Sequence, residues 1–164
     1  MWMLDLCSGL GGASEAFIQS GIWEVVRIEN NPILQGVPGT SDLDVLEWMD
    51  WLPELIGQKG RPCLVWASPP CLEFSQAYSA PLPRARREGR EFEPNMSIVE
   101  ACIDIIQYAG PTYWVIENVA GACPWFLPEL GKHQQKIGHF FLWGTFPRIN
   151  TPEGWKPKVG KTQD

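Results

Sequence analysis

Short apolar runs alternate with helical patterns along the first part of the chain. The apolar runs have the length and composition of buried strands, and they cover residues 2–6, 25–28, 64–67 and 113–116. Residues 13–20 and 96–108 instead repeat apolar side chains at helical spacing, and a glycine closely follows each stretch. Strands that alternate with helices are joined by right-handed crossovers. The pattern therefore predicts an α/β fold, a largely parallel sheet flanked by helices.

The unusual residues of the sequence follow these strands directly. A glycine-rich turn follows the first strand, Glu29 the second, a Ser-Pro-Pro-Cys segment ending at Cys71 the third, and Glu117 the fourth. Parallel sheets bind ligands at the carboxyl ends of their strands. We therefore expect an active site at this edge of the sheet.

The remaining segments carry weaker patterns. Residues 79–95 combine prolines, glutamates and arginines without apolar periodicity, which predicts a long exposed loop of the kind that often serves as a lid. The pattern weakens after Gly121, although residues 140–147 predict a short strand and turn. Residues 151–164 predict a frayed tail. We expect one catalytic domain over residues 1–150 and a tail over 151–164.

Composition narrows the class of protein. The 164 residues suit one domain, no apolar run is long enough for a membrane helix, and no signal pattern opens the chain. Five cysteines, an odd number without C-x-x-C spacing, favour free thiols in a reducing, cytoplasmic compartment. His133 and His139 have no ligand-spaced partners, so no metal is expected.

The charge pattern bears on the partner in two opposite ways. The net charge of −6 argues weakly against nucleic acid, because phosphate binding usually calls for an excess of basic residues. Four arginines nevertheless fall within seven residues, and they are Arg84, Arg86, Arg87 and Arg90. An acidic protein therefore carries one local basic patch.

Two features suit a bound cofactor. Gly9, Gly11 and Gly12 let the backbone approach a ligand closely, although a plain tight turn explains them equally well. Glu29 suits a ribose diol, and the alternative is a solvated glutamate at a strand end.

Two further features suit catalysis. The prolines before Cys71 stiffen the strand exit and hold the thiol exposed, which favours a nucleophilic thiolate. The alternative is a buried structural thiol, and we apply it to Cys63, Cys102 and Cys123. Burial would raise the pKa of Glu117 and make it a proton donor, whereas the alternatives are a helix cap and a surface charge.

Taken together, these segments resemble the DNA cytosine-5 methyltransferase family, in the family's order. The segment from Asp5 to Gly12 is similar to its cofactor turn, with Cys7 where the family usually has phenylalanine. Glu29 resembles its ribose-binding acid, and Asp44 the aspartate at the adenine amino group, with Asp42 as a close rival. Residues 69–75, P-P-C-L-E-F-S, match the catalytic P-P-C-x-x-F-S, and residues 117–119 match E-N-V.

The resemblance implies a Rossmann-like methyltransferase fold that binds S-adenosyl-L-methionine (AdoMet) and methylates cytosine at C5 in DNA. Cys71 would attack C6 of the base, while Glu117 would hydrogen-bond at N3. The implied cofactor contacts are Asp5, Cys7, Ser8, Gly9, Gly11, Glu29, Asn30, Asp44 and Pro69. The implied substrate contacts are Ser75, Arg84, Arg86, Arg87, Arg90 and Asn118.

Three departures from the family pattern shape the expectation. Residues 134–138 offer Q-x-K-x-G where the family has Q-x-R-x-R, the large target-recognition region is missing, and so is the final helix that completes the cofactor pocket. We therefore expect a compact member, from a phage or a restriction-modification system, with a short recognition site or with specificity supplied by a partner chain or a homodimer mate. The rival hypotheses are an inactive or split-enzyme AdoMet-binding subunit and an RNA cytosine-5 methyltransferase.

Overall fold

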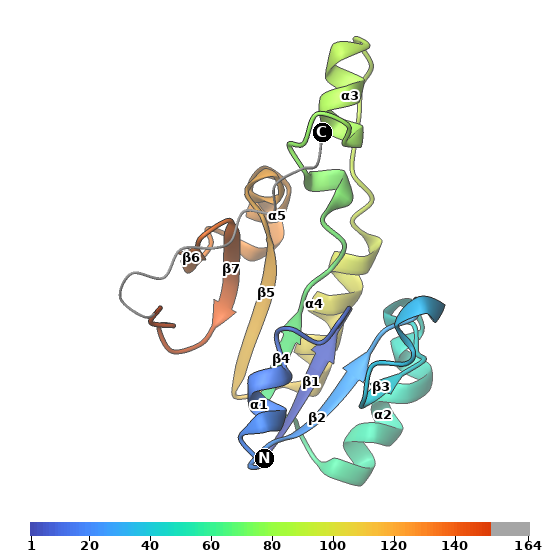
Figure 1. Ribbon diagram of the computed structural model, residues 1–164, viewed down its shortest axis with the longest axis vertical. Coiled ribbons are helices and arrows are strands. Elements are labelled where there is room, and N and C mark those ends of the chain that lie inside the picture. The colour runs from blue at the N-terminus through green and yellow to red at the C-terminus, as the bar shows by residue number, and fades with distance from the viewer. Residues whose placement is uncertain (152–164) are drawn as a thin grey trace.

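The computed structural model describes residues 1–151 and contains one seven-stranded sheet in the order β3-β2-β1-β4-β5-β7-β6 (Figure 1). The strands are β1 (Trp2–Leu6), β2 (Glu24–Ile28), β3 (Thr40–Ser41), β4 (Leu64–Ala67), β5 (Tyr113–Val119), β6 (Gln135–Ile137) and β7 (Phe140–Thr145). Strands β1 to β5 run parallel, whereas β7 is antiparallel to both of its neighbours. The predicted largely parallel sheet is confirmed, and apart from Thr151 the predicted tail lies outside the described residues.

Helices flank both faces of this sheet. They are α1 (Glu15–Gln19), α2 (Trp48–Lys59), α3 (Pro81–Arg87), α4 (Ser97–Ala109) and α5 (Cys123–Leu130). Four short 3-10 turns join them to the strands: η1 (Pro32–Leu34), η2 (Val45–Glu47), η3 (Leu72–Phe74) and η4 (Ala120–Ala122). Helices α2, α4 and α5 share the larger apolar core on one face, while α1 contributes Phe17 to the smaller core on the other.

The alternation of side chains along β1 separates these two cores. Leu4 and Leu6 point into the larger core beside Cys102 and Ile105 of α4, whereas Met3 points into the smaller one. Asp5 shares the face of Met3, so a carboxylate occupies a position where the strand pattern would place an apolar residue. Helix α4 ends at Gly110, whose φ of 55° is the left-handed conformation of a glycine cap.

The structure corrects the prediction of an exposed loop over residues 79–95. Part of this segment is helix α3, which begins at Pro81 and buries Leu82 and Ala85. Proline at the first helical position presets the backbone angle, and the two apolar residues three apart give the short helix one buried face.

Two longer helices were not predicted. Helix α2 carries Trp48, Trp51, Leu52, Leu55 and Ile56 on its packed side, a helical spacing that Pro53 interrupts in the sequence. Helix α5 lies in the region where the pattern weakens after Gly121. Each of these helices contains an internal proline, which is normally read as a break.

Candidate active site

The carboxyl ends of four parallel strands meet in one registered row. Ile28, Leu6, Ala67 and Ile116 are cross-strand partners along β2, β1, β4 and β5. The residues that follow them, and so lie together at this edge, are Glu29, Cys7, Ser68 and Glu117. Strand β1 has β2 as its neighbour on one side and β4 on the other, so the strand order reverses at β1. Open α/β sheets bind ligands at such a topological switch point, at the carboxyl ends of the strands.

The glycine turn that follows β1 contains three residues in the left-handed conformation. Cys7, Gly9 and Gly11 have φ values of 53°, 55° and 76°. The left-handed conformation is uncommon for a residue with a side chain, so Cys7 marks a locally strained position. A Cβ atom on Gly9 would meet no atom within 4 Å, which leaves free space above the turn.

Glu29 ties the turn to the end of β2. Its Oε2 accepts a hydrogen bond from the Gly9 backbone N–H at 3.0 Å, and its Oε1 accepts one from Asn31 N–H at 2.9 Å. The carboxylate is half-buried and held by backbone donors. It is therefore not the freely solvated glutamate that was the alternative for this position.

Asp44 and Asn30 meet across this edge. Asn30 Nδ2 donates to Asp44 Oδ2 at 2.9 Å, and Leu46 N–H donates to the other carboxylate oxygen at 2.8 Å. Asp42, the rival of Asp44, instead accepts from Gln35 Nε2 at 3.1 Å and is exposed. Two of the predicted cofactor residues thus form one preformed pair.

Asp5 and Ser8 lie beneath the turn rather than above it. Asp5 is 0% exposed, and within residues 1–151 neither its carboxylate oxygens nor Ser8 Oγ have a hydrogen-bond partner. Burial raises the pKa of Asp5 to about 6, against the opposing effects of the Ser14 hydroxyl and the Arg27 charge. A direct cofactor contact by the Asp5 carboxylate stays a prediction, because the carboxylate is covered in this structure.

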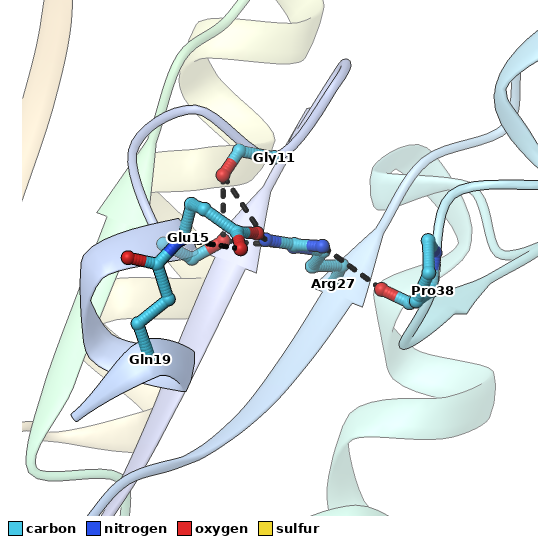
Figure 2. A network of polar contacts seen from close by, with 6 residues as sticks. Gly11, Glu15, Gln19, Arg27 and Pro38 are labelled. Atoms are coloured by element: carbon cyan, nitrogen blue, oxygen red, sulfur yellow. Dashed lines mark hydrogen bonds and ion pairs between the residues drawn. The ribbon is translucent and has the colours of Figure 1, made fainter. Parts of the chain in front are cut away.

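Arg27 lies opposite Asp5 in the pairing of β1 with β2 and was missed by sequence reasoning. Its guanidinium is enclosed by the glycine turn, helix α1 and the Pro38 carbonyl (Figure 2). The hydrogen bond and ion pair with Arg27 lower the pKa of Glu15. A charged residue inside the apolar run 25–28 was the available signal.

The Pro-Pro-Cys segment leaves β4 along an anchored path. Ser68 N–H donates to Leu6 O at 3.0 Å, and the Pro69 carbonyl accepts from Asn118 Nδ2 at 3.0 Å in the interior. Beyond Cys71, the buried Phe74 ring packs edge-on against Phe126. Cys71 itself is exposed, as predicted, between these two fixed points.

The other cysteines divide differently from the prediction. The structural-thiol interpretation holds for the buried Cys102, whose pKa is raised by contact with Cys7 and by its burial. Cys63 and Cys123 are only half-buried, so the interpretation as buried structural thiols fits them less well. Cys71 remains the most exposed thiol of the chain.

Glu117 is linked to the Cys71 segment through Ser68. The Ser68 hydroxyl donates to Glu117 Oε2 at 3.1 Å and accepts from Trp66 Nε1 at 3.0 Å. Burial raises the pKa of Glu117, with the Ser68 hydrogen bond acting in the opposite direction. Glu117 is half-buried within β5, so it is neither a helix cap nor a solvated surface charge.

Asn118 and Ser75 take local structural contacts in this structure. Asn118 is 1% exposed and accepts from Val119 N–H through Oδ1 while it donates to Pro69. Ser75 Oγ accepts from Ala77 N–H at 3.1 Å. The predicted substrate contacts of these two residues remain predictions, and Asn118 acts here as an anchor of the Cys71 segment.

The predicted basic patch forms on and after helix α3, which extends away from the sheet (Figure 1) and contacts η3 beside Cys71. Arg84 and Arg90 both pair with Glu88, and these contacts lower the pKa of Glu88. Arg87 lies 3.8 Å above the Tyr78 ring, and Arg86 is exposed. Helix α3 thus carries arginines and contacts the 3-10 turn that follows the exposed thiol.

Residues 134–138, which stand in place of the family's arginine motif, form and flank the edge strand β6. Gln134 Nε2 donates to Phe146 O at 2.9 Å, and Gln135 Nε2 donates to Ile149 O at 2.6 Å. Strand β6 is separated from β5 by β7. These side chains therefore hold the segment after β7 instead of lying beside Glu117.

No helix among residues 1–151 is long and apolar enough to cross a membrane. The same residues contain no group of three or more histidine, cysteine or acidic side chains placed to hold a metal ion.

Comparison with solved structures bears first on the fold. A crystal structure described as a "putative DNA modification methyltransferase" encoded within a prophage of E. coli superposes with a TM-score of 0.58 at 16% identity. The match covers 88% of this chain and 46% of that chain. This likeness confirms the predicted Rossmann-like methyltransferase fold.

A sequence relative then makes the resemblance more specific. The chain is 27% identical over 142 residues to the "Probable DNA (cytosine-5)-methyltransferase" of Frog virus 3 (isolate Goorha). The match covers 84% of this chain and 58% of the viral protein, so the chain spans little more than half of that relative's length. No protein-family model matches the chain. The viral relative confirms the resemblance to DNA cytosine-5 methyltransferases that the motifs indicated.

Proposed function

We propose that this protein transfers a methyl group from AdoMet to C5 of cytosine in DNA through a covalent bond between Cys71 and C6. The observation that carries the proposal is the double tie between the two catalytic segments. Ser68, which follows β4, donates a hydrogen bond to Glu117 of β5. Asn118, the next residue of β5, donates a hydrogen bond to the Pro69 carbonyl. An exposed thiol and a carboxyl group of raised pKa are thereby fixed at one ligand-binding edge.

The residues around the glycine turn fit the proposed cofactor. Glu29 is held at the edge of the sheet by two backbone donors and suits the ribose hydroxyls, and the Asn30–Asp44 pair offers a carboxylate for an adenine amino group. The open space above Gly9 admits a ligand against the backbone, beside Cys7, Ser8 and Pro69. AdoMet, when bound, supplies a methyl group on a sulfonium that a carbon nucleophile can accept.

Cys71 has the task of making C5 of cytosine nucleophilic. Its thiolate attacks C6, a sulfur–carbon bond forms, and the electron pair of the C5–C6 double bond is drawn toward N3. C5 of the resulting enamine can then accept the methyl group. Loss of the C5 proton and expulsion of the Cys71 thiolate restore the aromatic ring.

Glu117 controls the charge that develops on the base. Its raised pKa keeps the carboxyl group protonated closer to neutral pH, where it can donate to N3 as Cys71 attacks C6. The Trp66–Ser68 pair orients this carboxyl group. Catalysis therefore needs the thiolate form of one residue and the acid form of the other.

The arginines of α3 suit the phosphate backbone near the flipped base. A cytosine within a duplex must leave the stack before Cys71 can reach C6. Arg86 and Arg87 are exposed on α3, which contacts the 3-10 turn after Cys71, and Ser75 and Asn118 are further candidates for substrate contact. Phosphate contacts of this kind give affinity but no sequence information.

The described residues offer few groups for reading base edges. We propose a very short recognition site, or specificity supplied by a partner chain or a homodimer mate, because each bidentate contact to a base contributes only about 1–3 kcal/mol of discrimination. Sequencing of methylated positions on random DNA tests this proposal. A site of six or more defined base pairs read by the purified monomer would contradict it.

The decisive experiment for the proposed reaction uses radiolabelled AdoMet with duplex DNA, single-stranded DNA or RNA, followed by nucleoside analysis. We expect labelled 5-methyldeoxycytidine from DNA with the wild-type chain and none with Cys71→Ser. Label in RNA alone would favour the RNA methyltransferase. AdoMet binding without transfer to any substrate would favour the inactive or split-enzyme subunit.

A further inference from the structure

We propose that Arg27 is a positioning residue for the cofactor, because its buried guanidinium holds the glycine turn in its ligand-binding shape from below. This inference rests on the proposed AdoMet-dependent function. Arg27 lies on β2, between β1 and the short edge strand β3, and is 1% exposed. Charged side chains are almost never buried to this degree unless they are fully paired.

The hydrogen bonds of Arg27 converge on the turn. Nε donates to Ser14 Oγ at 2.8 Å, and Nη2 donates both to the Gly11 carbonyl at 3.1 Å and to Glu15 Oε2 at 3.0 Å (Figure 2). All three acceptors belong to the turn or to the first residues after it. The planar guanidinium therefore fixes the second half of the turn in a way that a single ammonium group cannot.

The same side chain also reaches the opposite wall of the site. Nη1 donates to Pro38 O at 2.9 Å, and the Arg27 backbone N–H donates to Gly39 O at 3.2 Å. The segment after Gly39 leads through β3 to Asp44. Arg27 thus links the glycine turn to the segment that carries the proposed adenine contact.

Gly11 and Arg27 are built around each other. A Cβ atom on Gly11 would lie 2.3 Å from Arg27 Cζ, and its φ of 76° already disfavours a side chain. The glycine at this position is therefore required by the guanidinium beneath the turn, and not by the open space above it. Gly9, by contrast, has free space where its Cβ would be.

Arg27 of β2 and Glu29, the residue that follows β2, hold the two ends of the turn. Glu29 accepts from Gly9 N–H on the ligand side, while Arg27 donates to Gly11 O on the buried side. Loss of Arg27 should leave Gly9 tethered and Gly11 free, which lowers affinity for the cofactor without touching Cys71 or Glu117.

The test compares Arg27→Lys with the wild-type chain by calorimetric titration with AdoMet, thermal unfolding without ligand, and steady-state kinetics. We expect the Kd and the KM for AdoMet to rise at least tenfold, while the KM for DNA and the kcat at saturating AdoMet change less than twofold. Amide hydrogen exchange of the unliganded variant should accelerate at residues 9–15 and not at Glu117. Ser14→Ala, which removes the acceptor of Arg27 Nε at a residue outside the predicted cofactor contacts, should raise the Kd for AdoMet in the same direction and by a smaller factor.

Ile105→Val serves as the matched control, because Ile105 is buried on the other face of the sheet and its truncation lowers stability without touching the turn. We expect this variant to lose stability but to keep the wild-type Kd. The inference is overturned if Arg27→Lys binds AdoMet like the wild type, or if Ile105→Val loses affinity to the same extent. It is also overturned if neither Arg27→Lys nor Ser14→Ala yields a folded protein, since Arg27 would then be a requirement of the fold. Absence of AdoMet binding by the wild-type chain would instead refute the proposed function itself.

Discussion

Asp5 makes the stability of this protein depend on pH in a direction opposite to that of most carboxylates. Its pKa rises from 3.8 to about 6 on folding, mainly because the carboxyl group is removed from water. The folded state therefore binds the proton more tightly than the unfolded state does. The stability that this group contributes is fully present below pH 3.8 and is lost as the pH rises through 6.

The size of the effect follows from the shift. A difference of about two pKa units corresponds to about 3 kcal/mol once both states are ionised, at about 1.4 kcal/mol per unit. About 1 kcal/mol of this is already lost at pH 4.5, so about 2 kcal/mol remain to be lost between pH 4.5 and pH 8. Replacement by asparagine removes the titrating group and leaves a side chain of similar size.

Urea unfolding of the wild-type chain and of Asp5→Asn at pH 4.5 and pH 8 measures this quantity. We expect Asp5→Asn to gain about 2 kcal/mol of stability relative to the wild type between pH 4.5 and pH 8, so that its free energy of unfolding minus that of the wild type is larger at pH 8. Any change in packing caused by the asparagine is the same at both pH values and cancels. Asp104→Asn, at an exposed position of α4, is the control and should show no such change. A difference that stays constant within about 0.5 kcal/mol, or that moves the other way, would refute the reasoning.

Three further predictions concern the proposed reaction. Cys71→Ser should abolish methyl transfer and keep the AdoMet affinity measured by calorimetry, and 5-fluorocytosine DNA should trap an adduct at Cys71; an active serine variant or an adduct at Cys63 would contradict the assignment. Ser68→Ala removes a hydrogen bond that lowers the pKa of Glu117. The alkaline limb of the pH profile of kcat/KM, where Glu117 loses its proton, should therefore move to higher pH. An unmoved limb would show that Ser68 does not act on Glu117. Replacement of all four arginines of the patch by alanine should weaken DNA binding broadly and reduce the salt dependence of the affinity. Arg61→Ala, at the other end of the sheet, is the control and should change neither. An unchanged salt dependence in the fourfold variant would exclude the patch as the phosphate contact. The four arginines are Arg84, Arg86, Arg87 and Arg90.

The positions of the catalytic candidates could be predicted because they depend on local signals. Cys71 and Glu117 each follow an apolar run directly, and parallel strands bring such positions to one edge. The contact that joins them could not be predicted, since Ser68 and Glu117 are 49 residues apart in sequence. The partners of Arg27 depend in the same way on cross-strand register and on the path of a turn.

The missed helices have a different cause. In α2 and α3 the apolar positions have helical spacing, but prolines within or beside them are usually read as breaks. Pro81 instead occupies the first helical position, where its missing N–H has no cost. Tertiary packing of Leu82 and Trp51 then outweighs the weak local preference.

The antiparallel strand β7 has a consequence for building on this scaffold. Its pairing places Phe140 beside Val119 and Thr145 beside Trp114, so β7 starts at the catalytic edge and runs away from it. The turn between β6 and β7, at Gly138 and His139, opens two residues from Glu117 along the paired strand. A base-reading loop grafted into this turn would emerge near Glu117, whereas one fused after β7 would start from the far rim and would have to cross the whole sheet.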